Sequence, residues 1–588
     1  MIRTPSPAIL SVVAVLAFGI FSVLLGQDTN WDLANYHLYN PYAFLTGRLH
    51  TDLAAAGFQS YFNPLLDLPY YWMTMNLPAP AVAFIMGALH GLALPLVAAI
   101  ARTVRPDAPP GESWWLALAG CLGAAFFSGI GNTMGDNTTA LLVLCALLLC
   151  LVALPVAGSR QAMLSILVAG LLVGAATGLK LTNAGFALAL AASFVFVRMP
   201  GRDRIVSIAV LTAGGIAGLV LTAGFWFWRM WAEFGNPLFP QFNSIFGSPM
   251  APAMNIGDPR WGPKNVVEAL AYPFVFTLDP DRFGETPIRQ LLWPVTYLLF
   301  IAWAAVVVVK RARGMSVPST APHLAEPVRF LFAFLAIGYL AWLAVFAIGR
   351  YTVAMEVLLP LATWVLLPHL LPRASARRIA KAVIILAVAV SVLPFRSWGH
   401  APFAEESYRV VPPPIAQPDR ATVLMLAHPV AWMAVFFPRE LAFVSLFKFP
   451  ESKAYYERAE SIMKTRGGEV WAIVPVATDT AANTLARFNE WARRHELAAK
   501  GFPCWAIQRM VRLSTRFRQV TLHPAGVCEF ELPPAQRRDL AAADGALVKH
   551  WADLLRQRNL VLEPASCKRH EAFIGETRYP YQFCRVTR

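Results

Sequence analysis

The chain has 588 residues, of which 57% are hydrophobic and only 14% charged, with a mean hydropathy of +0.50. An ordinary soluble domain carries about 25% charged residues, so this composition excludes a cytosolic enzyme, a collagen-like chain and a disordered scaffold. Apolar runs long enough to cross a bilayer as helices recur along the first two thirds of the chain. The sequence therefore predicts an α-helical polytopic membrane protein.

Eleven apolar runs are predicted to span the membrane. The first, Ala8 to Leu25, resembles a signal peptide, but no small-residue cleavage site follows it, so we interpret it as a retained helix. The remaining ten lie near residues 79–101, 113–130, 138–157, 162–179, 183–198, 205–228, 291–309, 328–348, 352–371 and 380–395.

The charges of the connecting segments predict an orientation. Alternate connections, counted from the N-terminus, are short and rich in Lys and Arg, whereas the loops at 26–78 and 229–290 are long and hold few. The positive-inside rule then places the N-terminus in the cytoplasm and the long loops outside. Eleven spans carry the C-terminal segment to the outside as well.

The composition changes near Arg396, which divides the chain into a membrane unit (1–395), a Pro-rich linker (396–420) and a C-terminal domain (421–588). In the C-terminal domain, short apolar strands alternate with helical patterns, which predicts an α/β fold. The expected strands are 422–427, 442–446 and 469–476, and the expected helices are 429–437, 451–464 and 480–499.

Four of the seven cysteines lie in this domain: Cys504, Cys528, Cys567 and Cys584. An even number in an extracytoplasmic domain predicts two disulfides, in any of three pairings. A zinc site is disfavoured because no CxxC pair occurs. The net charge of +15 is explained by the basic connections, and no zinc-finger, RNP or helix-turn-helix pattern supports a nucleic-acid partner. The P-loop pattern of ATP-driven transport is also missing.

Polar residues collect at the predicted outer ends of the helices. Asp28 and Asp32 follow the first span, Asp136 begins the fourth, Lys180 follows the fifth, and Arg350 lies in a short turn between two spans. Each has a simpler interpretation, such as a solvated loop, a helix N-cap or a snorkelling lysine, although an arginine at that depth is a functional candidate by default. If they converge, the cations suit a phosphate leaving group and an acid could activate an acceptor hydroxyl.

Five segments in order along residues 1–395 carry a family resemblance. They are Asp32-(three residues)-Tyr36-His37-Leu38, Gly135-Asp136-Asn137, the glycine-rich run from Gly170 to Asn183, Phe234-Gly235-Asn236-Pro237-Leu238-Phe239-Pro240, and Gly349-Arg350-Tyr351. Together they resemble motifs of the GT-C class of integral membrane glycosyltransferases. This class includes protein O-mannosyltransferases and the lipid A aminoarabinose transferase.

The resemblance implies a sugar donor carried on a polyprenyl phosphate. By position, Asp32 would be the catalytic base with Asp28 as the alternative, Asp136 an accessory acid, and Lys180 and Arg350 the phosphate contacts. It also implies substrate-binding roles for Tyr36, His37, Asn183 and Tyr351, with His37 supporting Asp32.

One departure from the family pattern affects this assignment. Asp28 and Asp32 are four residues apart rather than adjacent, which leaves the choice of base and any divalent metal open. The sequence itself requires no cofactor. The same loop offers Asp52 and Asp67 as lower-ranked candidates.

The implied function is sugar transfer to a hydroxyl of a glycan, lipid or protein, with inversion, at the periplasmic face of a bacterial inner membrane. The alternatives are a multi-span transporter or lipid-linked glycan flippase, an O-antigen ligase or polymerase, and a non-catalytic assembly protein. Transporters often show paired halves, and we find no convincing internal repeat.

Overall fold

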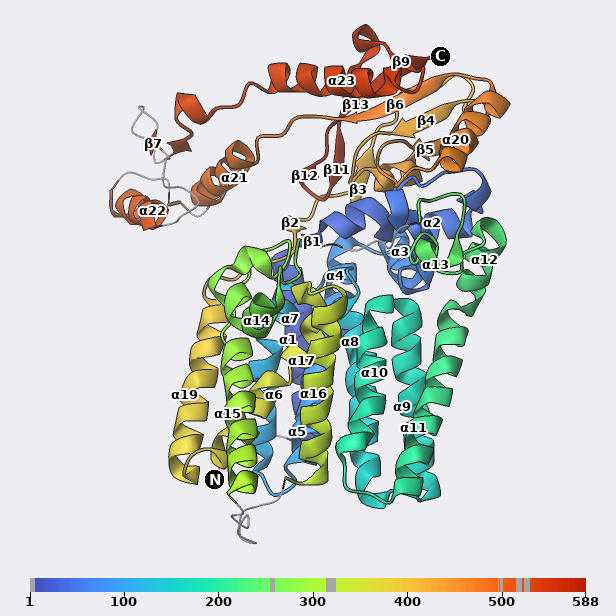
Figure 1. The fold of residues 1–588 in the computed structure, drawn as a ribbon. Helices are drawn as coiled ribbons and strands as arrows, with labels where there is room; N and C mark the ends of the chain where they lie inside the picture. Colours follow the sequence, from blue (N-terminus) through green and yellow to red (C-terminus); the bar gives the residue numbers. More distant parts are fainter. Residues whose placement is uncertain are drawn as a thin grey trace.

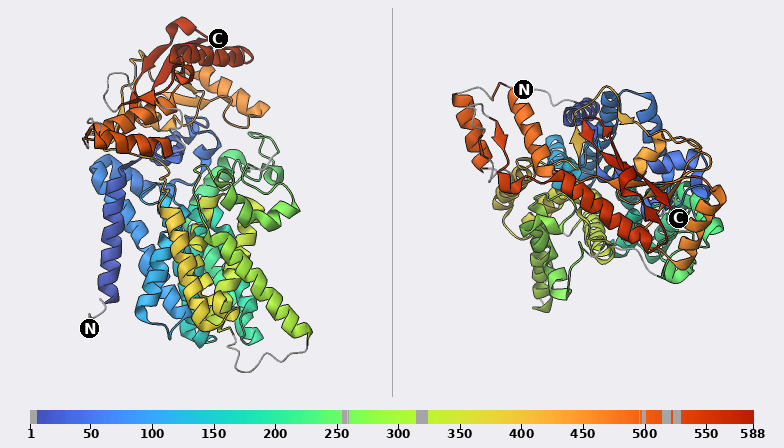
Figure 2. Two further views of the ribbon diagram at one scale, coloured as in Figure 1. Left: turned by 90° about the vertical axis from the view of Figure 1, so that its left-hand side faces the viewer. Right: turned by 90° about the horizontal axis from the view of Figure 1, so that it is seen from above.

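The computed structural model of the protein describes residues 6–253, 258, 260–313, 324–494, 496–497, 501–513, 521–522 and 529–588. A bundle of long helices carries the first loop and an α/β domain at one end (Figures 1 and 2). The N-terminal helix begins at the opposite end of the bundle, and the C-terminus lies on the α/β domain.

Within the described residues, seven helices or helix runs are long and apolar enough to cross a membrane. They are α1 (Pro7–Leu25), α4 with α5 (Ala79–Gly91 and Ala93–Val104), α8 (Asp136–Ala153), α9 (Arg160–Leu179), α11 with α12 (Gly201–Leu219 and Phe225–Phe234), α15 (Leu292–Ala312) and α16 (Glu326–Val345). An eighth is possible if the bent pair at Gly349–Glu356 and Leu359–His369, which contains α17 (Val353–Glu356) and α18 (Leu359–Leu366), forms one span.

The other three predicted spans are also helical and lie in the same bundle (Figure 1). The span at 113–130 is broken into α6 (Pro110–Cys121) and α7 (Ala124–Ser128), and the span at 183–198 contains the short α10 (Ala184–Ser193). The last is α19 (Arg373–Val392), whose first turns are basic. The predicted polytopic helical fold is therefore confirmed. The long outer loop additionally folds into α13 (Asn243–Phe246) and α14 (Val266–Leu278).

Helices α9 and α11 pack closely through glycines. A Cβ on Gly174 would lie 2.0 Å from the carbonyl oxygen of Gly215, and one on Gly218 would lie 2.1 Å from that of Leu171. Small residues let two helix backbones approach in this way inside a membrane. The glycine-rich run therefore has a packing role, and it fixes the end of α9, where Lys180 follows.

The α/β domain is built on a six-stranded sheet with strand order β10-β13-β6-β4-β5, in which β9 also pairs with β13. Strands β4 (Thr422–Met425), β5 (Ala442–Ser445) and β6 (Val470–Pro475) are parallel, and β13 (Tyr581–Thr587) runs antiparallel to β6. The three expected strands are confirmed, and two of the three expected helices are α20 (Lys453–Arg466) and α21 (Thr480–Arg494), whereas the third, expected at 429–437, is a 3-10 helix over Ala431–Phe436. The domain also contains α22 (Phe502–Leu513), β7 (Thr521–Leu522), β8 (Phe530–Glu531), α23 (Leu540–Arg556), β9 (Val561–Leu562), β10 (Lys568–His570) and β12 (Thr577–Arg578).

The loop that joins α1 to α4 packs into this domain rather than forming a free connection. It contains α2 (Tyr39–Leu45) and α3 (Leu68–Asn76), and Leu53 forms a parallel bridge with Val444, a residue of β5. At its start, β1 (Gln27–Asp28) pairs with β2 (His400–Ala401), which follows the last helix of the bundle. The segment predicted as a linker thus contributes β2 and also β3 (Tyr408–Val410), which pairs with β11 (Ala572–Ile574).

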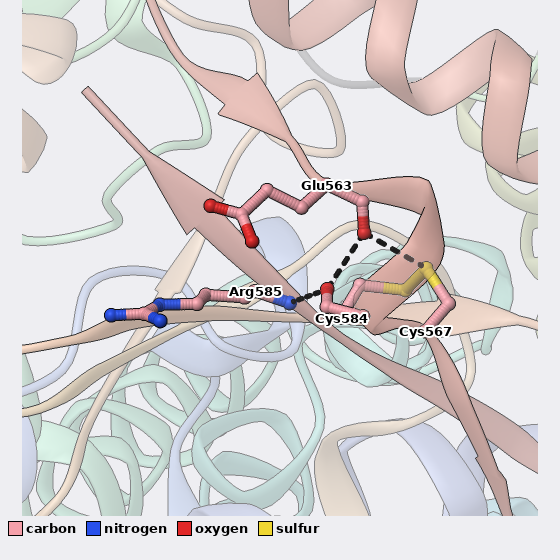
Figure 3. The surroundings of a disulfide bond; sticks show 5 residues. Glu563, Cys567, Cys584 and Arg585 are labelled. Atoms are coloured by element: carbon pink, nitrogen blue, oxygen red, sulfur yellow. Dashed lines mark hydrogen bonds between the residues drawn. A yellow bond between two sulfur atoms is a disulfide. The ribbon is translucent and has the colours of Figure 1, made fainter.

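One of the predicted disulfides joins Cys567 to Cys584, on β13 (Figure 3). Around it, the carbonyl oxygen of Glu563 and the backbone N–H of Arg585 are bridged by the Ser566 hydroxyl. Cys504 is also disulfide-bonded, and Cys528 lies outside the described residues. Cys121, Cys145 and Cys150 are free thiols.

Candidate active site

Asp32 lies directly before a π-helical turn, Leu33–His37, at the end of the bundle that carries the α/β domain (Figure 1). Single π turns inside helical segments occur frequently at functional sites. The whole turn is buried under the α/β domain, and the exposed fraction of Asp32 is only 4%. A carboxylate at this depth needs cationic or hydrogen-bonding partners.

Four charged side chains from four different elements meet at this point. Arg350 Nη1 lies 2.8 Å from Asp32 Oδ2 and 3.4 Å from Asp136 Oδ2. Lys180 Nζ lies 2.6 Å from Asp136 Oδ1 and donates to the carbonyl oxygen of Met134, also at 2.6 Å. The loop and helix ends that were predicted to face outward therefore bring Asp32, Asp136, Lys180 and Arg350 together. We call these four residues the charged cluster.

Glu285 and two aromatic rings complete its surroundings. Arg350 Nη2 lies 3.4 Å from Glu285 Oε1, and the Glu285 side chain is 38% exposed. The ring of Tyr351 lies against both cations, with its centroid 5.1 Å from the Arg350 guanidinium carbon and 5.3 Å from Lys180 Nζ. Trp398, beyond the last helix, lies 6.0 Å from the same guanidinium carbon.

The electrostatics of the charged cluster keep Asp32 ionised. Burial alone would raise its pKa, but the adjacent Arg350 guanidinium and the Lys180 ammonium outweigh burial, and the pKa falls below its ordinary value of 3.8. With Glu285 included, three carboxylates face two cations. The two contacts of 3.4 Å to Arg350 are much weaker than its 2.8 Å contact to Asp32.

Asp28, the alternative base, is placed outside the charged cluster. Its carboxylate accepts hydrogen bonds from the Asn30 amide and from the backbone N–H and hydroxyl of Thr133, at 2.7–2.9 Å. These contacts tie the first loop to the turn before α8. Asn183 is also turned away, since its side-chain amide donates to the carbonyl oxygens of Ala176 and Lys180.

Tyr36 and His37 lie on the other side of Asp32. The Tyr36 hydroxyl donates to Asp32 Oδ2 at 3.4 Å, and burial raises its pKa well above the ordinary value. His37 Nδ1 lies 2.7 Å from Asp67 Oδ1. The sequence gives Asp67 a low rank and does not single out Glu285. An isolated acidic residue in a long loop carries no sequence signal of which side chains it will contact in the fold.

The charged cluster does not form a ready metal site. Among the described residues, no group of three or more His, Cys, Asp or Glu side chains is arranged to hold a metal ion. The carboxylates of Asp32 and Asp136 are each paired with a cation instead.

Comparison with known proteins gives matches in structure alone. No protein-family model and no curated protein matches the chain. The oligosaccharyltransferase of Archaeoglobus fulgidus, solved with a tethered acceptor peptide, is similar at 12% identity and a TM-score of 0.41, over 90% of this chain and 75% of that one.

Two further solved structures are similar at the same level. The same archaeal enzyme, AglB, in complex with an inhibitory peptide and a dolichol-phosphate, has a TM-score of 0.40 at 12% identity, with the same coverage. ArnT from Cupriavidus metallidurans, bound to undecaprenyl phosphate, has a TM-score of 0.36 at 13% identity, over 82% of this chain and 94% of that one. Both proteins are GT-C glycosyltransferases, the class that the sequence motifs resemble.

Proposed function

We propose that the protein is a membrane glycosyltransferase that moves a sugar from a polyprenyl-phosphate donor to an acceptor hydroxyl at the outer face of the bundle. The observation that carries this proposal is the charged cluster, in which two cations and a buried ionised carboxylate lie at the outer ends of the membrane helices. A reaction between a lipid-held phosphate and a hydroxyl needs these groups at this depth.

Arg350 has donors available for the phosphate of the donor. Its Nε is buried and has no hydrogen-bond partner within the described residues, and its Nη2 makes only the 3.4 Å contact to Glu285. A phosphate oxygen would satisfy both donors, and guanidinium groups favour such paired contacts. Because Glu285 is partly exposed, its side chain can move aside into water when the phosphate binds.

Asp32 has one oxygen available for the acceptor. Its Oδ2 accepts from Arg350 and Tyr36, whereas no hydrogen bond to its Oδ1 is present in the described part of the chain. In the proposed step, the acceptor hydroxyl gives its proton to Asp32 and its oxygen bonds to the anomeric carbon. The bond from that carbon to the phosphate oxygen breaks, with inversion. Arg350 and Lys180 stabilise the phosphate as it leaves.

The test is sugar release or transfer from a panel of synthetic short-chain polyprenyl-phosphate sugars by the purified full-length protein, with and without EDTA. Removing a proton acceptor lowers rates by about 100-fold or more, so we expect the Asp32→Asn variant to lose turnover while it still binds donor. The exposed Asp553, on α23, supplies the matched Asp553→Asn control, which should keep wild-type turnover.

Two results would contradict the proposal. Full turnover in Asp32→Asn would exclude Asp32 as the base. Absence of both turnover and donor binding in the wild type, across the panel, would favour the transporter or flippase interpretation.

A further inference from the structure

His37 and Asp67 form a buried pair beside the charged cluster. His37 ends the π turn that follows Asp32, and Asp67 directly precedes α3. Their exposed fractions are 3% and 5%, and His37 Nδ1 lies 2.7 Å from Asp67 Oδ1. This contact orients the imidazole and favours the tautomer in which Nδ1 carries the proton.

The second ring nitrogen of His37 is buried and unused. Within the described residues, Nε2 has no hydrogen-bond partner. Leaving a buried polar nitrogen unpaired is unfavourable, so such an atom calls for an explanation. With Nδ1 held as a donor to Asp67, Nε2 carries a free lone pair and can accept a proton.

Asp32 and His37 are electrostatically coupled. The ring of Tyr36 lies 4.1 Å from that of His37, while its hydroxyl reaches Asp32. A positive charge on His37 lowers the pKa of Asp32. Arg350 and Lys180 lower the pKa of Asp32 as well. The titratable groups that face His37 are Asp32, Tyr36 and Asp67, and Lys180 and Arg350 lie behind them.

Asp32 is badly suited to keep a proton. Its salt bridge with Arg350 holds its pKa below 3.8, so at neutral pH a proton taken from the acceptor must move on. An imidazole, with an ordinary pKa of about 6.5, can hold that proton. Asp67 would then stabilise the imidazolium, as a buried carboxylate does for the histidine of a catalytic triad.

We propose that His37, held by Asp67, receives the proton that Asp32 takes from the acceptor hydroxyl. This inference rests on the proposed function. The acceptor O–H bond breaks, the new bond to the anomeric carbon forms, and the bond from that carbon to the phosphate breaks. The proton ends on His37 Nε2, and the polyprenyl phosphate leaves as the anion. His37 and Asp67 are positioning and proton-holding residues in this scheme, and Asp32 is the group that touches the acceptor.

The kinetic test is the pH dependence of kcat for the full-length protein with the polyprenyl-phosphate sugar panel. Only a neutral imidazole can accept a proton, so wild-type kcat should fall at acid pH, where the imidazole is already protonated. His37→Gln should lower kcat by about 100-fold, leave the KM for the donor within about twofold, and abolish this acid limb. Asp67→Asn should move the acid limb to lower pH, because the imidazolium loses its carboxylate partner.

A spectroscopic arm separates this inference from the proposed function. In protein labelled with ¹⁵N-histidine, the His37 signal is assigned by its loss in His37→Gln and titrated with and without Asp67→Asn. We expect the His37 signal to change at a lower pH in Asp67→Asn than in the wild type, because the imidazolium loses its carboxylate partner. The exposed His550, on α23, supplies the matched His550→Gln control, which should change neither the pH profile nor the His37 signal.

Three outcomes of these experiments distinguish the inference from its alternatives. An acid limb that persists unchanged in His37→Gln, at whatever residual rate, would show a structural role and overturn the inference. A His37 pKa that is the same in wild type and Asp67→Asn would overturn the pair even if no donor in the panel is turned over. A shifted pKa in a protein that turns over no donor would instead support the pair and count against the proposed function.

Discussion

At the scale of single residues, the position of Arg350 depends on a glycine. Gly349 N–H donates to the carbonyl oxygen of Phe283 at 2.6 Å, and a Cβ on Gly349 would lie 2.2 Å from the Phe283 ring. Only glycine permits this close approach of the two loops. The same contact brings Glu285, two residues beyond Phe283, to the guanidinium of Arg350.

The role of Glu285 gives a prediction about donor affinity. Under the proposed function, Glu285→Gln removes a negative charge from the place where the phosphate would bind, so it should tighten the binding of a polyprenyl phosphate. Because the side chain is partly exposed, solvent screens the charge and the gain should be modest, about threefold to tenfold. Microscale thermophoresis with the lipid measures it.

A matched control is Glu457→Gln on α20, where the side chain is 61% exposed and pairs with Lys453. This variant should bind the lipid as the wild type does. Weaker binding in Glu285→Gln would mean that Glu285 itself holds the donor, and would contradict the displacement described above.

The residues that could be predicted from the sequence are those at helix ends. Asp136, Lys180 and Arg350 follow or precede apolar runs, so the count of spans alone places them on one face. The contacts of Asp28, Asp67 and Glu285 depend on how loops fold onto one another, which no periodicity records. For that reason the sequence could not distinguish Asp28, which braces the turn before α8, from Asp32.

At the scale of elements, a buried ion pair locks the first loop to the α/β domain. Arg48 Nε lies 2.5 Å from Asp52 Oδ2, and the guanidinium also donates to the carbonyl oxygens of Arg439 and Leu441. Asp52 in turn accepts from the backbone N–H of Phe443 at 2.8 Å, at the start of β5. All three guanidinium nitrogens of Arg48 therefore donate hydrogen bonds, to partners in two different segments of the chain.

Breaking this pair should loosen the junction strongly. Asp52→Asn leaves the Arg48 charge buried without its counter-ion, which costs about 3 to 5 kcal/mol. We expect a lower Tm and faster hydrogen exchange in β5 and in residues 48–54, measured by mass spectrometry on the purified protein. The exposed pair Lys453–Glu457 should cost less than about 1 kcal/mol when Glu457 is neutralised, and an equal effect of both variants would contradict this account.

The Cys567–Cys584 disulfide closes a short loop within the sheet. Its sequence separation is 17 residues, for which the loss of unfolded-state entropy predicts a stabilisation of about 3 kcal/mol. The Cys567→Ser, Cys584→Ser double variant should therefore unfold at a lower temperature, with β9, β10 and β13 exchanging first. The Cys145→Ser variant is the control for a thiol substitution. An unchanged Tm in the double variant would contradict the expected contribution.

The elements of the α/β domain were predictable because strands and helices there differ in period and are separated by turn residues. The details of the membrane unit were harder to predict from the sequence. The break between α6 and α7, the bend after Arg350 and the folded outer loop all depend on tertiary contacts. An apolar run indicates how long a helix is, but not where that helix breaks or bends.

At the scale of the whole molecule, the basic helix ends gather at one end of the bundle and the α/β domain lies at the other (Figure 1). Helices α9, α11 and α19 begin with Arg160, Gly201-Arg202 and Arg373 at the end away from the domain. The arrangement agrees with the predicted orientation, in which this end faces the cytoplasm.

Reporter fusions in a bacterial host test that orientation. Alkaline phosphatase, which is active only outside the cytoplasm, should be active when fused after Arg588 and inactive when fused after Arg313, beyond α15. A green fluorescent reporter should give the opposite pattern at the same two sites. Activity of the phosphatase at Arg313 would reverse the orientation.

The pairing of the first loop with distant segments has a consequence for biosynthesis. The hydrogen bond from Arg48 to the carbonyl oxygen of Arg439 cannot form until Arg439 has been made, 391 residues later in the chain. At about 5 to 20 residues per second, a ribosome needs roughly 20 to 80 seconds to supply it. Asp32 and its neighbours therefore lack this part of their cover until about three quarters of the 588 residues have been made. A nascent chain that stops before β5 would contain all four residues of the charged cluster but not the part of the α/β domain that Arg48 and Asp52 contact.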